Sequence, residues 1–505
     1  MPNKISTVDY DYFETVCHEN IELPIDIDYA MPDYCPDVKK ILKCNPTVDI
    51  SAYSFTQDRM MCEGKLVLHI EYIDENSDTI RICDIAKDFS HSKELKSYEG
   101  KTIGKLKASV GHIICRAVSA RKLDIHLPVI LNMCIVIQKK NKLNCDCQNL
   151  EIKTETQTIS HAINAINHTF SVEEELQLPQ SSMPIDCVIR KSITLKDIKC
   201  ILQNDKIQLD ALADIGIVYR SFSENSTVER ISYNVPFSQV IDTNYVNSEC
   251  ISNTELNVCE FSIQAKEDST GEYTICDLYL KICASIFAYQ NKEIEIIVDA
   301  YSSKNHCKMH YGEINLSKYE GEHQEKMNLT KSVFLSDDEV EKVIDYWCEE
   351  VSVNTYYENN KINYRGKFNI CIIFKGKSGM VFSVTKTFDF TKSREFSELC
   401  GRKCEASVKM ELKNFRIIDG NNLEFNCDLV IFSNDFTSLS KNVLNNCEYI
   451  DDEEIVNEKI RVYYSQKGEK LWDIGKKYLS PVEEIIANNK LTDEKISTGS
   501  ALIIY

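Results

Sequence analysis

Hydrophobic and polar residues alternate along most of this chain, and the alternation dominates from about residue 46 to residue 433. A period of two places successive side chains on opposite faces, as in a half-buried β-strand. Turn-forming residues interrupt the alternating runs at short intervals, and helical periods are few. Many short strands at this spacing predict a mainly β protein built from β-sandwich-like domains.

Residues 460–505 follow a different pattern. A short alternating run at 460–464 predicts a strand, and apolar residues at helical spacing from Leu471 to Tyr478 predict a helix. Ser480 and Pro481 end that helix and begin a second one, and the apolar run 501–505 predicts a closing strand. The segment is therefore predicted to be a small α+β module. We expect the following side chains to form its core rather than a contact surface: Leu471, Trp472, Ile474 and Ile485.

Two stretches about 300 residues apart repeat one another. Residues 63–72, EGKLVLHIEY, match residues 365–374, RGKFNICIIF, and residues 88–95, DFSHSKEL, match residues 389–396, DFTKSREF. A middle copy is more divergent: ALADIGIVY at 211–219 takes the place of residues 64–72, and PFS at 236–238 takes that of residues 88–90. Three copies about 150 residues apart indicate whole domains rather than short solenoid repeats.

These copies predict domains at residues 1–165, 166–325 and 326–440. Pro36 is placed to open a short helix at 36–42, and a second, capped helix is expected at 336–344. Residues 441–459 contain the acidic run 451–454 and are predicted to be a solvated acidic linker. Such a linker would let the module at 460–505 move independently.

The length and charge narrow the class of protein. A chain of 505 residues is long enough for about three or four domains. The net charge of −20 opposes binding to nucleic acid or to an anionic membrane surface. No stretch approaches the roughly 18 apolar residues of a membrane span, so no membrane insertion is expected. The first residues lack the basic start and apolar run of a signal peptide, so the chain is expected to stay in the cytoplasm.

Residues with catalytic or metal-binding chemistry form no convincing motif. The 22 cysteines are scattered singly through apolar runs and are expected to be mostly buried, reduced thiols. Phosphate-binding glycine loops, GxSxG and HExxH are absent from the sequence. We therefore expect no enzyme activity, no catalytic residue, no metal and no cofactor. Histidine and cysteine residues do occur close together in three places, without the paired CxxC spacing of a structural zinc site: His306, Cys307 and His310; Cys145 and Cys147; Cys400 and Cys404.

The terminal segment resembles the LysM module over its full length. The likeness rests on Tyr464, Lys467-Gly468, Leu471-Trp472, Ile474, Tyr478, 482–485, Asn488-Asn489, Leu491, Gly499 and 502–504. LysM modules bind N-acetylglucosamine-containing glycans such as peptidoglycan in a shallow groove between two loops. The resemblance places that groove between Gly468, Glu469, Lys470 and Leu471 on one side and Ile496, Ser497, Thr498 and Gly499 on the other. The usual aspartate-threonine of the first loop is Glu469-Lys470 here, so a long cationic side chain could fill a sugar subsite or contact a protein.

The three β copies resemble the SPOCS family of spore-forming Firmicutes, through Pro36-Asp37-Val38 with Ile41-Leu42 and through the strand at 63–72. SPOCS domains followed by one LysM are similar to the SipL-type spore coat morphogenetic proteins. The resemblance implies a non-enzymatic adaptor in the mother cell, at the forespore surface and spore coat, whose partner is the coat morphogenetic ATPase SpoIVA. Two alternatives are a binder of peptidoglycan or cortex glycan and a wall hydrolase. The hydrolase would need a catalytic domain that the sequence does not show.

Overall fold

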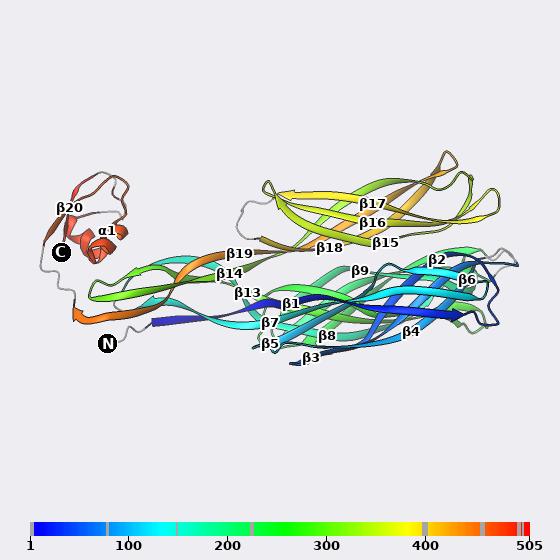
Figure 1. The fold of residues 1–505 in the computed structure, drawn as a ribbon, viewed down its shortest axis with the longest axis horizontal. Helices are drawn as coiled ribbons and strands as arrows, with labels where there is room; N and C mark the ends of the chain where they lie inside the picture. The colour runs from blue at the N-terminus through cyan, green and yellow to red at the C-terminus, as the bar shows by residue number, and fades with distance from the viewer. Residues whose placement is uncertain are drawn as a thin grey trace.

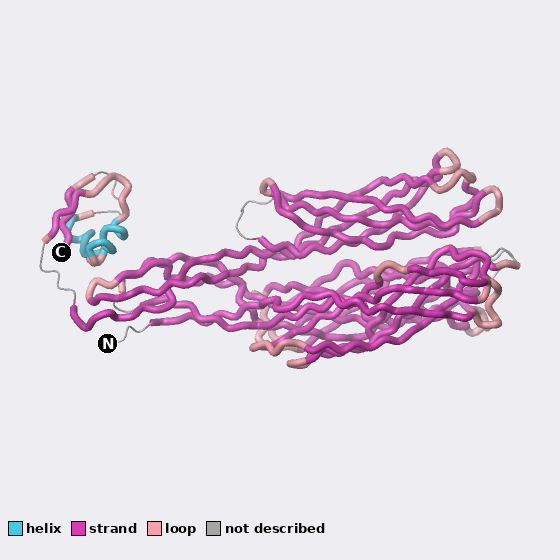
Figure 2. Tube along the Cα trace, viewed as in Figure 1, coloured by secondary structure: helices cyan, strands magenta, loops and turns pink. Residues whose placement is uncertain are grey.

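The computed structural model describes residues 5–76, 80–147, 150–222, 227–395, 402–454, 460–491, 496 and 499–505. In those residues the chain forms 21 β-strands and two short α-helices, which confirms the predicted mainly β class. Figure 1 and Figure 2 show one group of long strands that contains β15–β18, a second and larger body of long strands beside it, a narrow stalk, and a small module containing the helices at the far end of the stalk.

The strands fall into three consecutive units: unit 1 at residues 5–147, unit 2 at 151–301 and unit 3 at 305–454. Each unit starts with a long strand, continues with a three-stranded meander, and ends with a long strand that pairs back onto the first. In unit 1 the order of pairing is β1-β7-β5, with β6 also on β7, and β2-β3-β4. The strands of unit 1 are β1 (Ile5–Ala30), β2 (Val38–Phe55), β3 (Arg59–Asp74), β4 (Ile80–Glu94), β5 (Lys101–Val110), β6 (Ile114–Ser119) and β7 (Lys122–Cys147).

Units 2 and 3 repeat this topology. Unit 2 pairs as β12-β13-β8 and β11-β10-β9, and unit 3 as β14-β19-β18 and β15-β16-β17. The strands of unit 2 are β8 (Glu151–Gln177), β9 (Ile185–Gln203), β10 (Lys206–Ser221), β11 (Val228–Asp242), β12 (Ile251–Glu267) and β13 (Tyr273–Tyr301). Those of unit 3 are β14 (Asn305–Phe334), β15 (Val340–Glu358), β16 (Lys361–Gly376), β17 (Val381–Glu395), β18 (Arg402–Ile418) and β19 (Asn422–Glu454).

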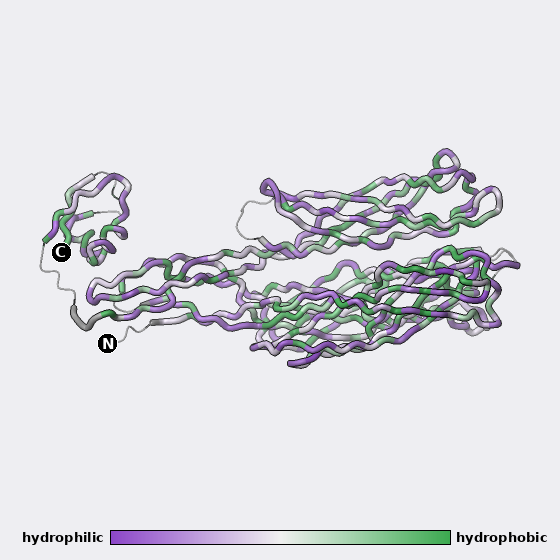
Figure 3. The backbone as a smooth tube through the Cα atoms, in the orientation of Figure 1, coloured by the Kyte–Doolittle hydropathy of each residue, from purple (hydrophilic) through white to green (hydrophobic). Residues whose placement is uncertain are grey.

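The two sheets of each unit pack face to face around a hydrophobic core. In unit 1 the core combines residues of both sheets, for example Leu66 and Leu68 of β3 with Leu127 and Val129 of β7. Units 2 and 3 also have hydrophobic cores between their paired sheets. Hydrophobic and hydrophilic residues alternate along these strands (Figure 3), which is the pattern from which the strands were predicted.

The long strands continue past the sandwiches and form a stalk, defined here as residues 5–12, 139–147, 151–162, 291–301, 305–318 and 438–454 (Figure 1). It consists of three antiparallel strand pairs, β1-β7, β8-β13 and β14-β19. The strand pairs share one small core, made of Tyr10, Leu143, Ile159, Ile294, Ile296, Leu316 and Val443. Side-chain bonds join them further: Lys441 Nζ lies 2.6 Å from Glu155 Oε2. Every unit therefore contributes one antiparallel strand pair to the stalk.

Charged residues of all three units meet where the sandwiches adjoin. Asp345 of β15 is 3% exposed and pairs with Arg190 of β9 and Arg230 of β11. Lys43 of β2 lies 2.6 Å from Glu349 of β15. Lys196 of β9 also pairs with Glu411 of β18 (3.1 Å). Unit 3 is therefore attached to both other units by charged contacts. Buried charges of this kind are stable only when paired.

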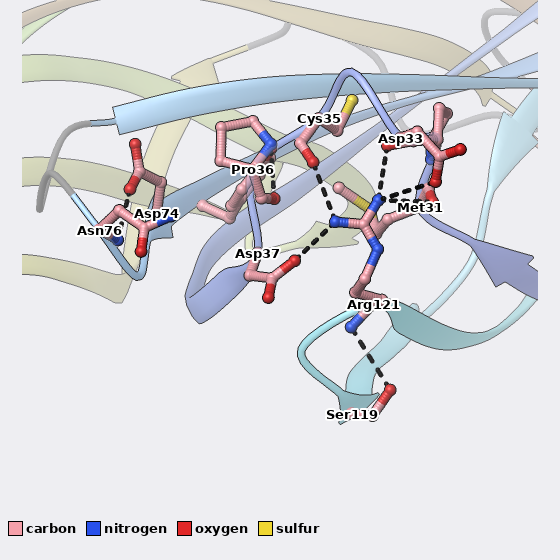
Figure 4. A network of polar contacts seen from close by, with 11 residues as sticks. Met31, Asp33, Cys35, Pro36, Asp37, Asp74, Asn76, Ser119 and Arg121 are labelled. Carbon is pink, nitrogen blue, oxygen red and sulfur yellow. Dashed lines mark hydrogen bonds and ion pairs between the residues drawn. The ribbon is translucent and has the colours of Figure 1, made fainter.

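The helix predicted at residues 36–42 is wrong. Val38 begins strand β2, and its amide donates to the carbonyl of Ala120 (2.8 Å). The loop before it is fixed by Arg121, whose guanidinium donates to Asp37 Oδ1 (2.6 Å) and to the carbonyls of residues 31, 32 and 35 (Figure 4). These tertiary hydrogen bonds fix the backbone at Pro36 and Asp37 in a non-helical conformation. They outweigh the local preference for a helix start that Pro36 provides.

The helix predicted at 336–344 is wrong for the same reason. Strand β15 begins at Val340, whose amide donates to the carbonyl of Gly420 (2.9 Å). The predicted domain boundaries at 165/166 and 325/326 fall inside β8 and β14, and residues 441–454 of the expected acidic linker continue β19 and pair with β14. The remaining linker residues, 455–459, lie outside the described residues.

Candidate functional site

The C-terminal module has the predicted order of elements. Strands β20 (Arg461–Tyr464) and β21 (Ala501–Ile504) pair antiparallel, with α1 (Leu471–Tyr478) and α2 (Val482–Asn489) between them. Its core is closed by six buried side chains: Leu471, Ile474, Ile485, Ile496, Leu502 and Ile504. The Asn489 amide joins α2 to β21, since it donates to the Ile503 carbonyl (2.7 Å) and accepts from the Ile503 amide (2.6 Å). The helices therefore lie against the strand pair.

The two predicted groove loops are adjacent. The Gly468 amide donates to the carbonyl of Ile496 (2.9 Å), and the Ile496 amide donates to the carbonyl of Glu469 (3.2 Å). Gly468 has a φ of +91°, a conformation that glycine adopts without strain. The structure therefore brings the described members of both loops together, while Ser497 and Thr498 lie outside the described residues.

The predicted groove residues differ in what they can offer a ligand. Gly468, Lys470 and Gly499 are exposed. The side chain of Leu471 is fully buried and that of Ile496 is 6% exposed, so both belong to the core and only their backbones face the loops.

Glu469 is turned back onto its own loop. Its carboxylate accepts hydrogen bonds from the Tyr463 hydroxyl (3.0 Å) and from the Gln466 amide (2.9 Å). Because these bonds use both carboxylate oxygens, Glu469 stabilises the loop. Lys470 is therefore the long, charged side chain that the predicted groove presents to solvent within the described part of the module.

The module is docked on the tip of the stalk. Trp472 Nε1 of α1 donates to Asp299 Oδ2 (2.8 Å), and Lys476 Nζ of the same helix donates to Asp299 Oδ1 (2.6 Å). The Tyr301 hydroxyl donates to the carbonyl of Ser480 (2.9 Å). The rings of Tyr301 and Trp472 meet edge to face with centroids 5.0 Å apart. The independent movement that the sequence suggests is thus opposed by a specific contact.

The contact between the module and the stalk changes the interpretation of Trp472. We expected this residue in the core of the module, but it lies half-buried against the stalk instead. A Cβ added at Gly475 would lie 2.5 Å from the Tyr301 hydroxyl, so the glycine allows the close approach. Nothing in the sequence near Asp299 and Tyr301 marks them as partners of a segment more than 170 residues away. Sequence analysis therefore missed both.

Charged residues both favour and oppose the contact between the module and the stalk. Burial alone would raise the pKa of Asp299, but hydrogen bonds from Lys476, Trp472 and Tyr311 leave it below its ordinary value. Burial raises the pKa of Glu151 on β8, and the charges of Glu483 and Glu484 on α2 raise it further. Asp299 therefore attracts the module, whereas Glu151 repels its second helix.

The module and the units show no metal site or membrane span in the described parts of the chain. Neither helix found there is long and apolar enough to cross a membrane. Within the same ranges, histidine, cysteine and carboxylate side chains do not gather in groups of three or more that could hold a metal ion. His310, one of the residues examined for zinc spacing, pairs with Glu448 across β14 and β19 instead (3.2 Å).

Comparison with known protein families gives one informative result. A family model described as SipL, SPOCS domain, matches residues 184–266. The match spans the meander β9-β10-β11 and nearly all of β12, in the middle unit whose sequence is the most divergent of the three. No curated protein and no solved structure matches the chain. The match supports a SipL-like protein with a role related to sporulation.

Proposed function

We propose that this protein is a morphogenetic adaptor of the spore envelope, acting in the mother cell at the forespore surface. It helps to anchor the basement layer of the coat through non-covalent protein contacts. The observation that carries the proposal is the SipL SPOCS match in a unit whose topology occurs three times, joined to a module docked on their common stalk. Units 1 and 3 are proposed as further SPOCS domains, and the module as a LysM.

The architecture suits an adaptor. Three sandwiches offer long edge strands such as β4, β11 and β17, each bonded to one neighbour, and exposed edges can accept a further strand from a partner. The stalk holds the module away from the sandwiches, so different surfaces can bind different components. Binding and positioning need no catalytic group.

The proposed partner is the coat morphogenetic ATPase SpoIVA, and the proposed contact is the loop around Lys470. Lys470 is exposed and precedes α1 directly, so its ammonium is free to approach an acidic surface. The docked Trp472 is directed to the stalk and is therefore not part of this contact. A charge at the rim of an interface mainly guides association and selects the partner.

The test is a binding measurement with the full-length chain and purified ATPase, comparing the wild type with Lys470→Glu. The variant should bind about tenfold more weakly, because it places a carboxylate against an acidic surface. Lys490→Glu is the matched control, since it makes the same charge change at another exposed lysine of the module. Equal binding by all three chains would remove Lys470 from the contact, and no binding by the wild type would overturn the choice of partner.

Glycan binding is the second candidate, favoured by the adjacency of the two loops at Gly468 and Ile496. Co-sedimentation of the full-length chain with purified peptidoglycan tests it. Sedimentation that chito-oligosaccharide abolishes, together with no retention by the ATPase, would replace the adaptor proposal for this module. Retention by the ATPase without sedimentation would reject the glycan candidate.

A further inference from the structure

A cavity with a volume of about 610 Å³ lies between units 1 and 2. Residues 50–55 of β2 and 101–104 of β5 line it from unit 1, and residues of β8, β12 and β13 line it from unit 2. Cys259 of β12 is one of these residues and is a free thiol, as are the other cysteines that the structure describes. Because both units form its walls, a molecule bound in this cavity would contact both.

Two lysines enter the cavity from opposite ends. Lys101 of β5 donates to the carbonyl of Ala165 on β8 (3.1 Å). Lys281 of β13 pairs with Ser171 of β8 in the strand register and donates to the carbonyl of Ser51 across the interface (2.9 Å). Ala165 and Ser171 are about 20 Å apart along an extended strand. The cavity is therefore elongated, with one ammonium group toward each end.

The positive charges of these lysines are not neutralised by the protein around them. Among the described residues that line the cavity, Lys101 and Lys281 are the charged ones, and none is a carboxylate. Lys281 bonds to a backbone carbonyl, and Lys101 bonds to the Asn164 side-chain oxygen (2.7 Å) as well as to a carbonyl. Burial lowers the pKa of Lys101 because the charged form is partly desolvated. In a chain with a net charge of −20, this lining favours an anion.

The middle of the cavity is aromatic. The rings of Tyr53 and Phe55 on β2 meet edge to face, with centroids 6.0 Å apart. The Phe55 ring covers Gly104, whose carbonyl accepts a hydrogen bond from the Asn167 amide (2.7 Å). Asn167 lies on β8 between the positions of the two lysines, so the rings also lie between them. An apolar group would be accommodated here.

Each end of the cavity also has a hydroxyl group. Ser51 lies at the Lys281 end, and Thr102 follows Lys101 on β5. Neither hydroxyl has a hydrogen-bond partner among the residues that the structure describes. A hydroxyl can donate to a carboxylate or phosphate oxygen, so each end offers an ammonium group and a hydroxyl to one anionic group.

We propose that this cavity binds an elongated small molecule with an anionic group at each end and an apolar middle. One end group pairs with Lys281 and Ser51, and the other with Lys101 and Thr102. The middle of the ligand contacts the rings of Tyr53 and Phe55. Carboxylates and phosphates share the required chemistry, because both accept charge-assisted hydrogen bonds from lysine.

The experiment is isothermal titration calorimetry of the full-length chain with four probes: octanedioate, octanoate, butanedioate and 1,6-hexanediol bisphosphate. Octanedioate should bind about tenfold more tightly than octanoate, because octanoate has the same chain length and can pair with only one lysine. Butanedioate should bind more weakly than octanedioate, since it is too short to reach both lysines. The tighter binder of the two long dianions identifies the end group as carboxylate or phosphate.

Variants of the two lysines test the geometry. In Lys281→Met and in Lys101→Met, octanedioate and octanoate should bind with equal affinity, because one end of the cavity has lost its charge. Lys87→Met is the matched control and should keep the wild-type preference. Lys87 of β4 also donates to a backbone carbonyl (2.9 Å to that of Asp26) but does not line the cavity.

Equal affinity of the wild type for octanedioate and octanoate would overturn the proposal, as would the absence of binding by all four probes. Butanedioate that binds as tightly as octanedioate would show that the two ends do not act together. The proposal would also be wrong if the preference for octanedioate persisted in both lysine variants or disappeared in Lys87→Met. The wild-type comparison decides the question even where a variant fails to fold.

Discussion

Individual charged residues at the unit interfaces respond to the groups that the fold places around them. Asp49 of β2 is half-buried close to Lys191 of β9 and Glu260 of β12, which belong to unit 2. Burial, in excess of the attraction of Lys191, raises the pKa of Asp49 from 3.8 to about 6. The folded protein therefore holds this proton more tightly than the unfolded chain does.

This residue gives a prediction on pH dependence. Between about pH 4 and pH 6 the folded state binds more protons at Asp49 than the unfolded state, so its contribution to stability falls as the pH rises through that window. Asp49→Asn carries no charge to bury and should raise the free energy of unfolding at pH 7.5 by about 1–2 kcal/mol, with much less effect at pH 4. Urea unfolding at both pH values measures this. The exposed control Asp88→Asn should change stability by less than about 0.5 kcal/mol at either pH, and a loss of stability in Asp49→Asn at pH 7.5 would contradict the prediction.

At the scale of the strands, the repeated sequence corresponds to a repeated packing feature. Gly64 of β3 pairs with Phe89 of β4, and Gly366 of β16 pairs with Phe390 of β17. A Cβ at Gly366 would lie 2.3 Å from the Phe390 ring and 2.1 Å from the Ser352 carbonyl oxygen. The phenyl ring occupies the space above the glycine, so the two residues are needed together.

The middle unit has an alanine in place of the glycine at the equivalent position. Ala211 of β10 pairs with Phe237 of β11, and the ring of Phe237 lies against Phe170 with centroids 5.8 Å apart. The sequence divergence of this unit is therefore local, while its topology is the same as that of its neighbours.

This difference predicts opposite tolerances at equivalent positions. Gly366→Ala should destabilise the protein by about 1–3 kcal/mol, because either the Phe390 ring or strand β15 must move. The matched exchange Ala211→Gly should cost only about 1 kcal/mol, from chain entropy and lost burial. Thermal unfolding of both variants measures the order of the two effects. A neutral Gly366→Ala would show that the ring adapts without cost.

At the scale of the whole molecule, the stalk connects the three units with one another and with the module. Each unit gives one antiparallel strand pair to it, and Asp299 and Tyr301 at the end of β13 contact the terminal module. The position of the module is set by few residues, so small changes in charge should shift the balance between docked and released states.

Two variants should move that balance in opposite directions. Asp299→Asn weakens the bonds from Trp472 and Lys476 and should disfavour docking by about 2 kcal/mol, a typical value for hydrogen bonds to a charged group. Glu151→Gln removes the repulsion of the α2 carboxylates and should favour docking. Each chain compared also carries Trp347→Phe, so that Trp472 is its single tryptophan. The fluorescence emission of Trp472 should shift to longer wavelength when the module is released from the stalk. Identical spectra for all chains would mean that neither charge controls docking.

Much of this molecule was predictable from the sequence. Alternation indicated the strands, because one face of each sheet is buried, and the repeated segments at 63–72 and 365–374 are the central strands of equivalent meanders. The order of elements in the terminal module also followed from spacing. In each case a local period reports a burial pattern that neighbouring residues share.

Tertiary structure decided what a local period does not contain. Arg121 and the carbonyl of Gly420 hold the segments expected as helices in extended form, and β19 pairs with β14 through residues expected as a linker. Trp472, which was expected in the core of the module, contacts Asp299 and Tyr301 of the stalk instead. Each of these outcomes depends on contacts between residues far apart in the chain. The energies of these contacts exceed local conformational preferences. Such contacts produce no periodic pattern in the sequence from which they could be predicted.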